Sequence, residues 1–389
     1  MTRASLSSFL QLKLTSLVLI AAGCGGDATA AAGDGVRHAT PDDKTIAALP
    51  RTSVVYADKD GHFNVHDLNT DKSTRIGAAR TVYNGNYAAH FGLSPNRKWI
   101  AFAGAPDGRD VYWNNFSAPG VYVMSVDGEQ TRKIVDAIPA PGLTSCGLGG
   151  YCRYGTCNEA NNTCSGSSYN YTINITPMAW SYDSTTVWFK INFVGPSFGG
   201  FSAIVGINIE TGEILDLGEL PCLSFSAPIP HPTKNEVWVH YSGVKGNVGC
   251  SIDAGLYRYD MSKPGKPVRS LVPGSSAHNA GWDHFRWSPD GARLVFVRPH
   301  QNIDLYAFNV ATGMYENFFV GGSMGHVDRF GFSPAGDRIV VCYRTKPEDD
   351  PSQPLSPLQA FITDLPFSMD RTKYVTPRFG NIHLCNFDW

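Results

Sequence analysis

Short alternating strands, each preceded by the same kind of polar turn, recur along the chain after residue 50. Each segment begins with a bulky or turn-forming residue, passes through a polar turn and continues as alternating apolar and polar residues. Five segments share this pattern: LSPNRKWIAFA (93–103), WSYDSTTVWFKI (180–191), PHPTKNEVWVHY (230–241), WSPDGARLVFV (287–297) and FSPAGDRIVVC (332–342). Pro, Asp, Asn and Gly suit the bend, and the alternation predicts a strand with one buried face.

Each of these segments is followed by further strand-forming stretches. Second strands are predicted at residues 121–127, 203–210, 256–261, 305–310 and 360–365. After a short polar turn a third strand follows, for example at 131–135 and 268–272. One more apolar strand precedes each turn, which makes four antiparallel strands per unit. Such a unit, repeating about every 45 to 57 residues with one larger insertion, predicts an all-β fold, the β-propeller.

The repeat resembles that of a known family. WSPDGARLVFV is closely similar to the TolB-like (PD40, WD40-like) propeller repeat, and FSPAGDRIVVC and LSPNRKWIAFA are similar to it as well. The other two segments are degenerate. The resemblance extends over nearly all of the chain after residue 50 and implies a six-bladed propeller. It does not include the small N-terminal α/β domain of TolB itself, so the relationship is one of repeats only.

The two ends of the chain are predicted to close the ring. Residues 53–58, 63–68 and 73–76 have the pattern of three strands of a first blade that lacks its innermost strand. The segment NIHLCNFDW (381–389) has the pattern of an innermost strand with nothing after it. We predict that they complete one blade within a propeller spanning 51–389, which removes an exposed sheet edge. The alternative is a loose C-terminal tail on an open ring.

The N-terminus is predicted to be an export signal (1–23) followed by a flexible tether (24–50). Residues 14–22 are apolar but too few to span a bilayer as a helix. The sequence AAGC ending at Cys24 resembles the lipobox of bacterial lipoproteins, which implies cleavage before Cys24 and acylation of its thiol. The alternative is an ordinary signal peptide with a chance cysteine. We therefore expect an exported protein, lipid-anchored in the bacterial cell envelope at the outer membrane or cell surface.

Composition narrows the range of partners. The formal net charge is −2 and there is no basic stripe, which argues against nucleic acid as a partner. Charged residues make up only 17% of the chain, whereas Gly (40) and Pro (25) are plentiful, as expected for short strands joined by tight turns. We expect a monomer.

Nine cysteines in an exported chain indicate disulfides, and removal of Cys24 from the count leaves an even number. An insert between the second and third blades (137–171) resembles a truncated EGF-like knot. Its cysteines are Cys146, Cys152, Cys157 and Cys164. Two local disulfides are favoured over a zinc site, because zinc ligands usually come in close Cys-x-x-Cys pairs. Tyrosines near the knot are either a contact patch for a protein or glycan or packing residues: Tyr151, Tyr154, Tyr169 and Tyr171.

The other four cysteines are predicted to pair across blades. Cys222 in a crossover and Cys250 in a loop of the next blade fall on the same face of the predicted ring. Cys342 and Cys385 fall in the last and first blades, which are neighbours in a closed ring. A bridge there would lock the closure, and two buried free thiols are the alternative.

The two faces of the predicted propeller differ. With strands lettered a to d from the centre outward, the a–b and c–d turns lie on one face and are all short. The opposite face carries longer connections, at 104–120, 137–171, 194–202, 242–255 and 346–358. Long loops on a rigid scaffold commonly carry binding residues, so we expect this loop-rich face to be the functional one. Neutral variation in loop length is the alternative.

Several histidines are predicted to gather near one mouth of the central channel. His90 and His284 each stand four residues before a turn serine, and His383 is expected to hold the same position on the closing strand. His278 and His326 are expected in crossovers just before innermost strands. Histidines converging from different blades can bind a divalent metal. The alternative is that they pack at blade junctions and hydrogen-bond to the backbone.

This arrangement resembles that of oligogalacturonate lyases, whose propellers use channel histidines and a metal to cleave uronate chains. The resemblance implies metal ligands at His90, His284 and His383. It also implies that Arg286, Asp328 and Arg329 engage a carboxylated sugar.

Two functional hypotheses follow, together with a purely structural envelope role. The leading one is a binding or scaffold protein of the cell envelope, and the second is a metal-dependent polysaccharide lyase or hydrolase. The segment Gly321–Gly325 (GGSMG) matches a nucleophile elbow formally, but it is expected in a crossover between blades rather than a hydrolase sheet. No catalytic residue is assigned.

Overall fold

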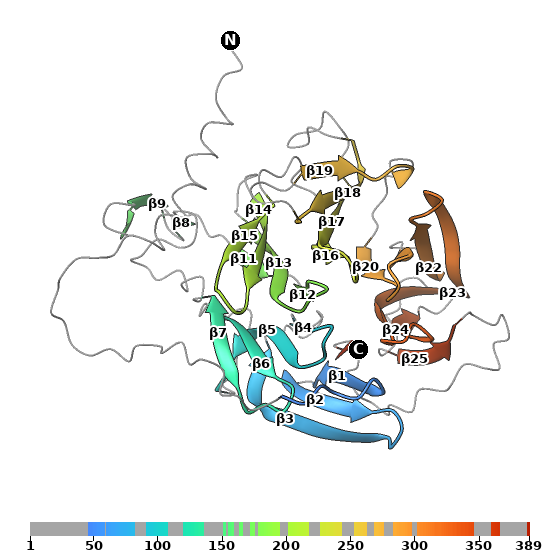
Figure 1. The fold of residues 1–389 in the computed structure, drawn as a ribbon, viewed down its shortest axis with the longest axis horizontal. Coiled ribbons are helices and arrows are strands. Elements are labelled where there is room, and N and C mark those ends of the chain that lie inside the picture. The colour runs from blue at the N-terminus through green and yellow to red at the C-terminus, as the bar shows by residue number, and fades with distance from the viewer. Residues whose placement is uncertain are drawn as a thin grey trace, which may run out of the picture.

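Strands account for all the regular secondary structure that the protein shows in its described residues (Figure 1). The computed structural model describes residues 46–58, 60–81, 91–107, 120–135, 151–152, 155–158, 163–165, 172–175, 178–194, 201–217, 226–242, 253–262, 268–275, 283–297, 302–345, 359–365 and 387–389. Within these ranges, no helix has the length and apolar character needed to cross a membrane. The predicted all-β class is confirmed.

The strands follow the predicted units closely. They are β1 (Ser53–Ala57), β2 (His62–Asp67), β3 (Lys72–Thr81), β4 (Phe91–Leu93), β5 (Trp99–Ala105), β6 (Gly120–Ser125), β7 (Thr131–Val135), β8 (Tyr151–Cys152), β9 (Gly155–Asn158), β10 (Thr163–Ser165), β11 (Thr172–Ile175), β12 (Ala179–Trp180), β13 (Thr186–Val194), β14 (Phe201–Asn208), β15 (Ile214–Asp216), β16 (Ile229–Pro230), β17 (Glu236–Tyr241), β18 (Gly255–Asp260), β19 (Val268–Leu271), β20 (Asp283–Trp287), β21 (Arg293–Val297), β22 (Asn302–Asn309), β23 (Met314–Phe332), β24 (Arg338–Thr345), β25 (Gln359–Asp364) and β26 (Phe387–Asp388).

Antiparallel pairing groups these strands into four larger sheets and one small one. The first runs β26-β1-β2-β3-β5-β6-β7 with β4 on β5, and it divides into two units at the short contact between β3 and β5. A second sheet holds β11 to β15, a third β16 to β19, and a fourth β20 to β25. The small sheet, β8 to β10, lies in the predicted insert between the second and third units.

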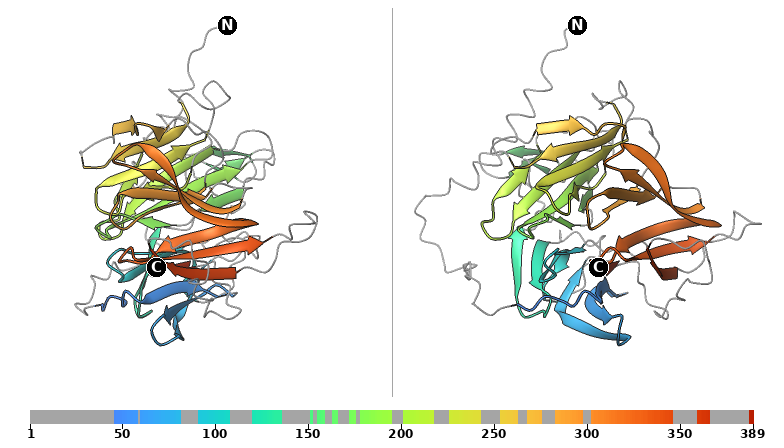
Figure 2. Two further views of the ribbon diagram at one scale, coloured as in Figure 1. Left: turned by 90° about the vertical axis from the view of Figure 1, so that its right-hand side faces the viewer. Right: turned by 45° about the vertical axis from the view of Figure 1, so that its right-hand side comes forward.

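The innermost strands follow one another around a common centre. β26 contacts β4, β4 contacts β12, β12 contacts β16, β16 contacts β20, and β20 contacts β23. Figure 1 shows the sheets radiating from this centre, with the C-terminus close to it, and the two rotated views of Figure 2 show the same arrangement. This is the architecture of a β-propeller.

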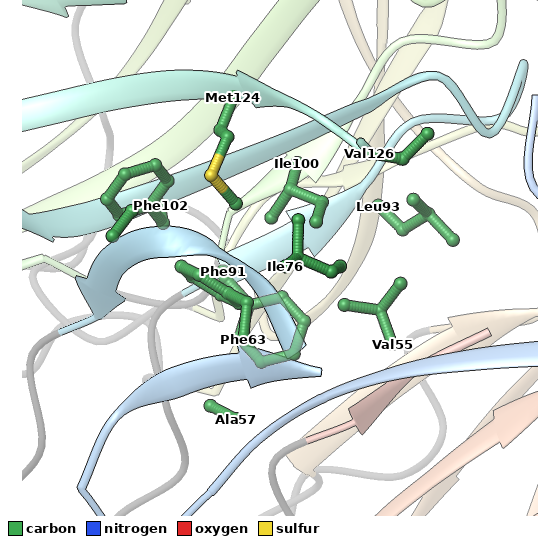
Figure 3. Packing of buried hydrophobic residues seen from close by; sticks show 11 residues of the cluster. Val55, Ala57, Phe63, Ile76, Phe91, Leu93, Ile100, Phe102, Met124 and Val126 are labelled. Carbon is green, nitrogen blue, oxygen red and sulfur yellow. The ribbon is translucent and has the colours of Figure 1, made fainter. Parts of the chain in front are cut away.

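Apolar clusters join each unit to the next. In the cluster between the first two units, the ring of Phe63 meets those of Phe91 and Phe102 edge-on at centroid distances of 5.3 and 5.1 Å (Figure 3). A further cluster joins β24 of the last unit to β1 and β26 of the first, through Val340 and Cys342 on one side and Phe387 on the other. The core is therefore a series of interfaces between neighbouring sheets rather than one central mass.

The predicted pairing of the two chain ends is confirmed. Tyr56 lies opposite Phe387, and Val55 lies opposite Asp388, in antiparallel register. A Cβ atom on Gly331 would lie 2.9 Å from the ring of Phe387, so glycine makes room for that ring. The count of six blades stays a prediction, because residues 366–386, where we expect the last strand of the sixth unit, lie outside the described part of the chain.

Serine locks the tight turns between innermost and second strands. The Oγ atoms accept the N–H five residues ahead at 2.9–3.0 Å, in the pairs Ser94–Trp99, Ser181–Thr186, Ser288–Arg293 and Ser333–Arg338. Each serine also donates to an Asn or Asp side chain in the same turn. The pattern is local in sequence, which explains why these turns are recognisable without a structure.

Two details differ from the predictions. The chain between the fifth and sixth units has no crossover loop, because β23 continues from its pairing with β22 at Met324 into its pairing with β24 at Gly325. The packed part of the chain also starts before residue 51, since Ile46 and Leu49 lie against the first apolar cluster. Leu49 additionally donates its N–H to the carbonyl of Arg97 at 3.0 Å, so the end of the predicted tether is attached to the sheet.

Candidate functional site

The structure describes only part of the predicted channel site. His284, Arg286 and Arg329 lie in innermost strands with described side chains, and His326 and Asp328 lie in β23, where only the backbone is described. The remaining predicted residues fall outside the described part of the chain: His90, His278, His383, Tyr154, Tyr169, Tyr171, Cys24, Cys146, Cys222, Cys250 and Cys385.

Two expectations about residues in β23 are corrected. His326 was expected in a crossover, but it lies within β23 and pairs with Arg344, because that strand runs on without a loop. The segment Gly321–Gly325 likewise lies within β23 rather than in a crossover.

The last two units place different residues at one repeat position. His284 and Arg329 each stand four residues before the turn serine of their unit, so the arginine replaces the histidine of the preceding repeat. Both strands are irregular there, with register shifts between Asp283 and Arg286 in β20 and between Val327 and Arg329 in β23. Bulges of this kind re-aim side chains, and they are common next to functional sites.

Arg329 is buried against two aromatic rings. Its exposed fraction is 4%, and the guanidinium carbon lies 5.7 Å from the ring centroid of Phe91 and 5.7 Å from that of Phe387. Within the described part of the chain, neither Nη1 nor Nη2 has a hydrogen-bond partner. A buried guanidinium with two unused donor nitrogens is unusual, because buried polar groups are nearly always hydrogen-bonded.

Other charges lie close to this guanidinium. Burial, and then the nearby charge of Arg286, lower the pKa of Arg329 to about 10, and the charge of Asp388 opposes both effects. The carboxylate of Asp388 accepts the N–H of Leu93 at 2.8 Å and that of Trp389 at 3.2 Å. Both oxygens of Asp388 therefore accept backbone N–H groups, and the bond to Leu93 ties the closing strand to β4.

His284 has an uncommon backbone conformation beside this group. Its φ is +54°, in the left-handed region that residues other than glycine seldom adopt. Its side chain is half-buried. Such conformations cost about 1–3 kcal/mol and tend to occur at functional sites. The neighbouring Arg286 donates from Nη1 to the carbonyl of Phe285 at 3.0 Å.

A metal site cannot be assembled from the described residues alone. Among them, no group of three or more His, Cys, Asp or Glu side chains is placed to hold a metal ion. Of the three predicted ligands only His284 is described, so the predicted ligand set stays a prediction and no chemistry is derived through a metal.

Four of the predicted disulfide cysteines lie in described strands, three in the insert and one in the last unit. Cys157 lies directly opposite Cys164 in the β9–β10 hairpin, and Cys152 lies in β8 beside them. Directly opposed residues in an antiparallel pair have Cα atoms about 4.5–5.5 Å apart, within the range that a disulfide spans. Cys342 is buried in β24 at the junction between the last and first units.

Sequence analysis did not find the partners of Arg329. Phe91, Phe387 and Asp388 lack any signal of function, since each looks like an ordinary strand residue. The repeat position of Arg329 was the available signal, because it is occupied by histidine in the preceding unit.

The fold and its centre define a β-propeller protein, built of repeated antiparallel units whose innermost strands contact one another in succession. Neither a family model nor a curated relative matches the chain. Similar solved structures include TolB from Acinetobacter baumannii, with 12% identity and a TM-score of 0.46, covering 80% of this chain and 60% of TolB. This chain therefore spans less than two thirds of the length of TolB.

Two further similar structures come from different kinds of protein. An oligogalacturonate lyase in complex with manganese is 13% identical, with a TM-score of 0.45, covering 81% of this chain and 77% of the lyase. The β-propeller domain of Cps50 (Swd1) from Myceliophteria thermophila is 10% identical, with a TM-score of 0.35, covering 75% and 82% of the two chains. All three include β-propellers, and at this level of similarity they carry no information about function.

Proposed function

We propose that this protein is an exported, envelope-attached binding or scaffold protein that holds a protein or glycan partner with the loop-rich face of its propeller. The observation that supports this proposal is the difference between the two ends of the strands. On one face the chain reverses in short turns locked by serine, such as those at Ser94 and Ser288. The longer connections leave from the opposite face.

The longer connections are separated from the tight turns by the full length of the strands. They run between β5 and β6, between β7 and β11, between β17 and β18, and between β24 and β25. The connection between β7 and β11 carries its own small sheet, β8 to β10, with Tyr151 at its start. Binding residues concentrate in variable connections on a rigid scaffold. A substitution on the face of tight turns can therefore serve as the control when partner binding is measured.

The test compares three versions of the full chain as bait for envelope material. One is the wild type, one has residues 137–171 replaced by a short Gly-Ser linker, and one carries Ala335→Lys in an exposed position of a tight turn. We expect a partner that wild type and Ala335→Lys both retain and the linker variant loses. Equal capture by all three proteins would contradict the assignment of the loop-rich face.

Attachment to the envelope is tested separately. Cys24 lies outside the described residues, and its lipobox-like context is the ground for expecting acylation. We expect a fatty-acid label on the wild type that Cys24→Ser abolishes, together with release of the variant from the membrane fraction. A label that survives the substitution would place the modification elsewhere.

The second functional hypothesis, a metal-dependent oligouronate lyase or hydrolase, stays a prediction. His284 is the described member of its ligand set and lies next to Arg286 in β20. Metal content of the purified protein separates the two hypotheses. Stoichiometric metal that is lost in both His90→Ala and His284→Ala would favour the enzyme, and metal content unaffected by either substitution would contradict it.

A further inference from the structure

The hairpin formed by β2 and β3, at the outer edge of the first unit, brings a serine, a histidine and an aspartate together (Figure 1). Ser73 of β3 lies directly opposite His66 of β2, and its Oγ is 3.0 Å from Nδ1 of that ring. Nε2 of the same ring lies 3.5 Å from Oδ1 of Asp71, which belongs to the turn between the two strands. One imidazole therefore contacts a hydroxyl with one nitrogen and a carboxylate with the other.

These contacts decide which nitrogen of His66 carries the proton. A carboxylate accepts hydrogen bonds and donates none, so Asp71 selects the tautomer with hydrogen on Nε2. Nδ1 is then an acceptor and receives the O–H of Ser73. Burial lowers the pKa of His66, while the charges of Asp71 and Asp67 oppose that effect, so the ring is neutral at pH 7 and can take up a proton.

We propose that Ser73 is the nucleophile of an acyl-transfer site that hydrolyses carboxylic esters, with His66 as its base and Asp71 as the group that orients the base. A hydroxyl, a base and an orienting carboxylate in contact form the arrangement that activates a serine. Such sites are recognised by geometry rather than by chain order. The site lies within one hairpin, so it does not depend on the loop-rich face of the proposed function.

The exposure of the side chains suits these roles. Ser73 occupies an exposed position, and the side chain of Asp71 is 52% exposed, whereas that of His66 is only 5% exposed. An ester can therefore reach the hydroxyl from solvent while the base is shielded from water. Arg75, which is also exposed, lies two residues along β3 on the same side as Ser73, with Nη2 at 2.8 Å from Nε2 of His62. Its positive charge is available to stabilise the negative oxygen that forms on the ester.

The reaction takes place in two halves. Oγ of Ser73 attacks the carbonyl carbon while its proton passes to Nδ1 of His66. The C–O bond to the alcohol then breaks, and the departing oxygen takes that proton. Water attacks the acyl-serine with the same proton transfers, which releases the carboxylic acid and restores the hydroxyl of Ser73. Asp71 stays ionised and stabilises the imidazolium that forms in each half.

The experiment uses the full chain and two probes, a fluorophosphonate that reacts with activated serines and the ester p-nitrophenyl acetate. We expect a covalent adduct that mass spectrometry of peptides locates on Ser73, together with release of p-nitrophenol. Ser73→Ala should abolish both signals. His66→Gln should slow adduct formation about 100-fold, which is a typical contribution of a general base.

A matched control is Ser262→Ala. Ser262 is also an exposed serine whose Oγ donates to a carboxylate, that of Asp260 at 2.5 Å, and within the described ranges no histidine is hydrogen-bonded to it. This substitution should leave both signals at the wild-type level. Circular dichroism verifies that each variant is folded, and Ser73→Ala changes an exposed position, so its fold should be unaffected.

The positioning role of Asp71 is measured by the pH dependence of adduct formation. The rate should rise with pH as His66 loses its proton. Because the carboxylate of Asp71 stabilises the protonated ring, Asp71→Asn should move the midpoint to lower pH and reduce the plateau rate. Asp71→Glu should restore part of both. A midpoint that Asp71→Asn does not move would contradict the proposed arrangement.

Three other results would overturn the proposal. They are the absence of an adduct on the wild type, an adduct located on a residue other than Ser73, and an undiminished rate in a folded His66→Gln variant. None of these results bears on partner capture by the loop-rich face, so the two proposals can fail independently.

Discussion

Arg97 and Arg329 are both buried arginines, yet their guanidinium groups have very different surroundings. Arg97 donates from Nε to the carbonyl of Leu49 at 3.0 Å and from Nη2 to those of Pro50 and Ser53 at 2.8 and 2.6 Å. Only its Nη1 is left without a partner within the described part of the chain. Arg329 makes none of these bonds and has aromatic rings instead.

The two arginines nevertheless share their electrostatic setting. Burial lowers the pKa of each to about 10, and the charge of Asp388 opposes that effect in both. Desolvation therefore disfavours both charges to a similar degree, while only Arg97 offsets that cost with backbone hydrogen bonds. The comparison teaches that backbone hydrogen bonds give Arg97 a role in the fold, whereas Nη1 and Nη2 of Arg329 make no such bond to the described residues.

The largest effect is expected from Arg97→Met. The substitution leaves the carbonyls of Leu49, Pro50 and Ser53 without their donor and frees the segment before β1. Each such charge-assisted bond is worth about 1.5–3 kcal/mol, so we expect the free energy of unfolding to fall by about 4 kcal/mol. Urea denaturation at pH 7 measures it. A loss below about 1 kcal/mol would contradict the role of Arg97 in stabilising the fold.

His231 is a third buried basic residue. It extends the comparison of the two arginines because its side chain can lose its proton. It takes the place of the turn serine, and its Nδ1 accepts the N–H of Thr233 at 3.2 Å. Burial, and then the charge of Lys234, lower its pKa from 6.5 to about 4, with Glu236 opposing. Between pH 6.5 and 4, His231 therefore binds a proton in the unfolded chain but not in the folded chain.

Stability is accordingly expected to be full above pH 6.5 and to fall as pH drops through that window, by about 3 kcal/mol from this group. In His231→Ser, which restores the turn residue of the other units, the slope should be smaller. Denaturation at pH 4 and pH 7 for both proteins measures it. Some dependence of the free energy of unfolding on pH should remain in His231→Ser, because burial also lowers the pKa of His62 and His66. Identical slopes in the two proteins would contradict the assignment to His231.

A smaller effect is expected from Asp388→Asn, which removes the one charge common to both arginines. The amide oxygen can still accept the N–H of Leu93, so the closing strand should stay in place. We expect a loss of about 1–2 kcal/mol at pH 7 from the uncompensated cations. In the Arg329→Met background the loss should be smaller, and a double-mutant cycle measures the difference. An unchanged loss would indicate that Asp388 does not act on Arg329.

The smallest effect on stability is expected from Arg329→Met. Removing a buried cation whose Nη1 and Nη2 have no hydrogen-bond partner among the described residues should leave the free energy of unfolding within about 1 kcal/mol of wild type, or raise it. The same urea denaturation as for Arg97→Met compares the two directly. A loss as large as that of Arg97→Met would show that Arg329 stabilises the fold as Arg97 does.

Much of this architecture was predictable because its determinants are local. A turn such as Ser288–Gly291 is held by hydrogen bonds within a few residues, and the strand after it alternates in a way that is visible in the sequence. The pairing of the chain ends was predictable too, since the last residues carried an innermost-strand pattern and the first unit lacked one. Local hydrogen bonding and alternation therefore determined the fold class and most strands.

Only the tertiary structure decided what surrounds each buried charge. Arg329 lies against Phe91 and Phe387, residues far from it in the chain that reach it because the last unit meets the first two. Likewise β23 runs unbroken between two units, which placed His326 in a strand instead of a loop. The sequence identifies which side chains are polar, but their partners depend on how the units pack, because burial and hydrogen bonding there are set by segments from different units of the chain.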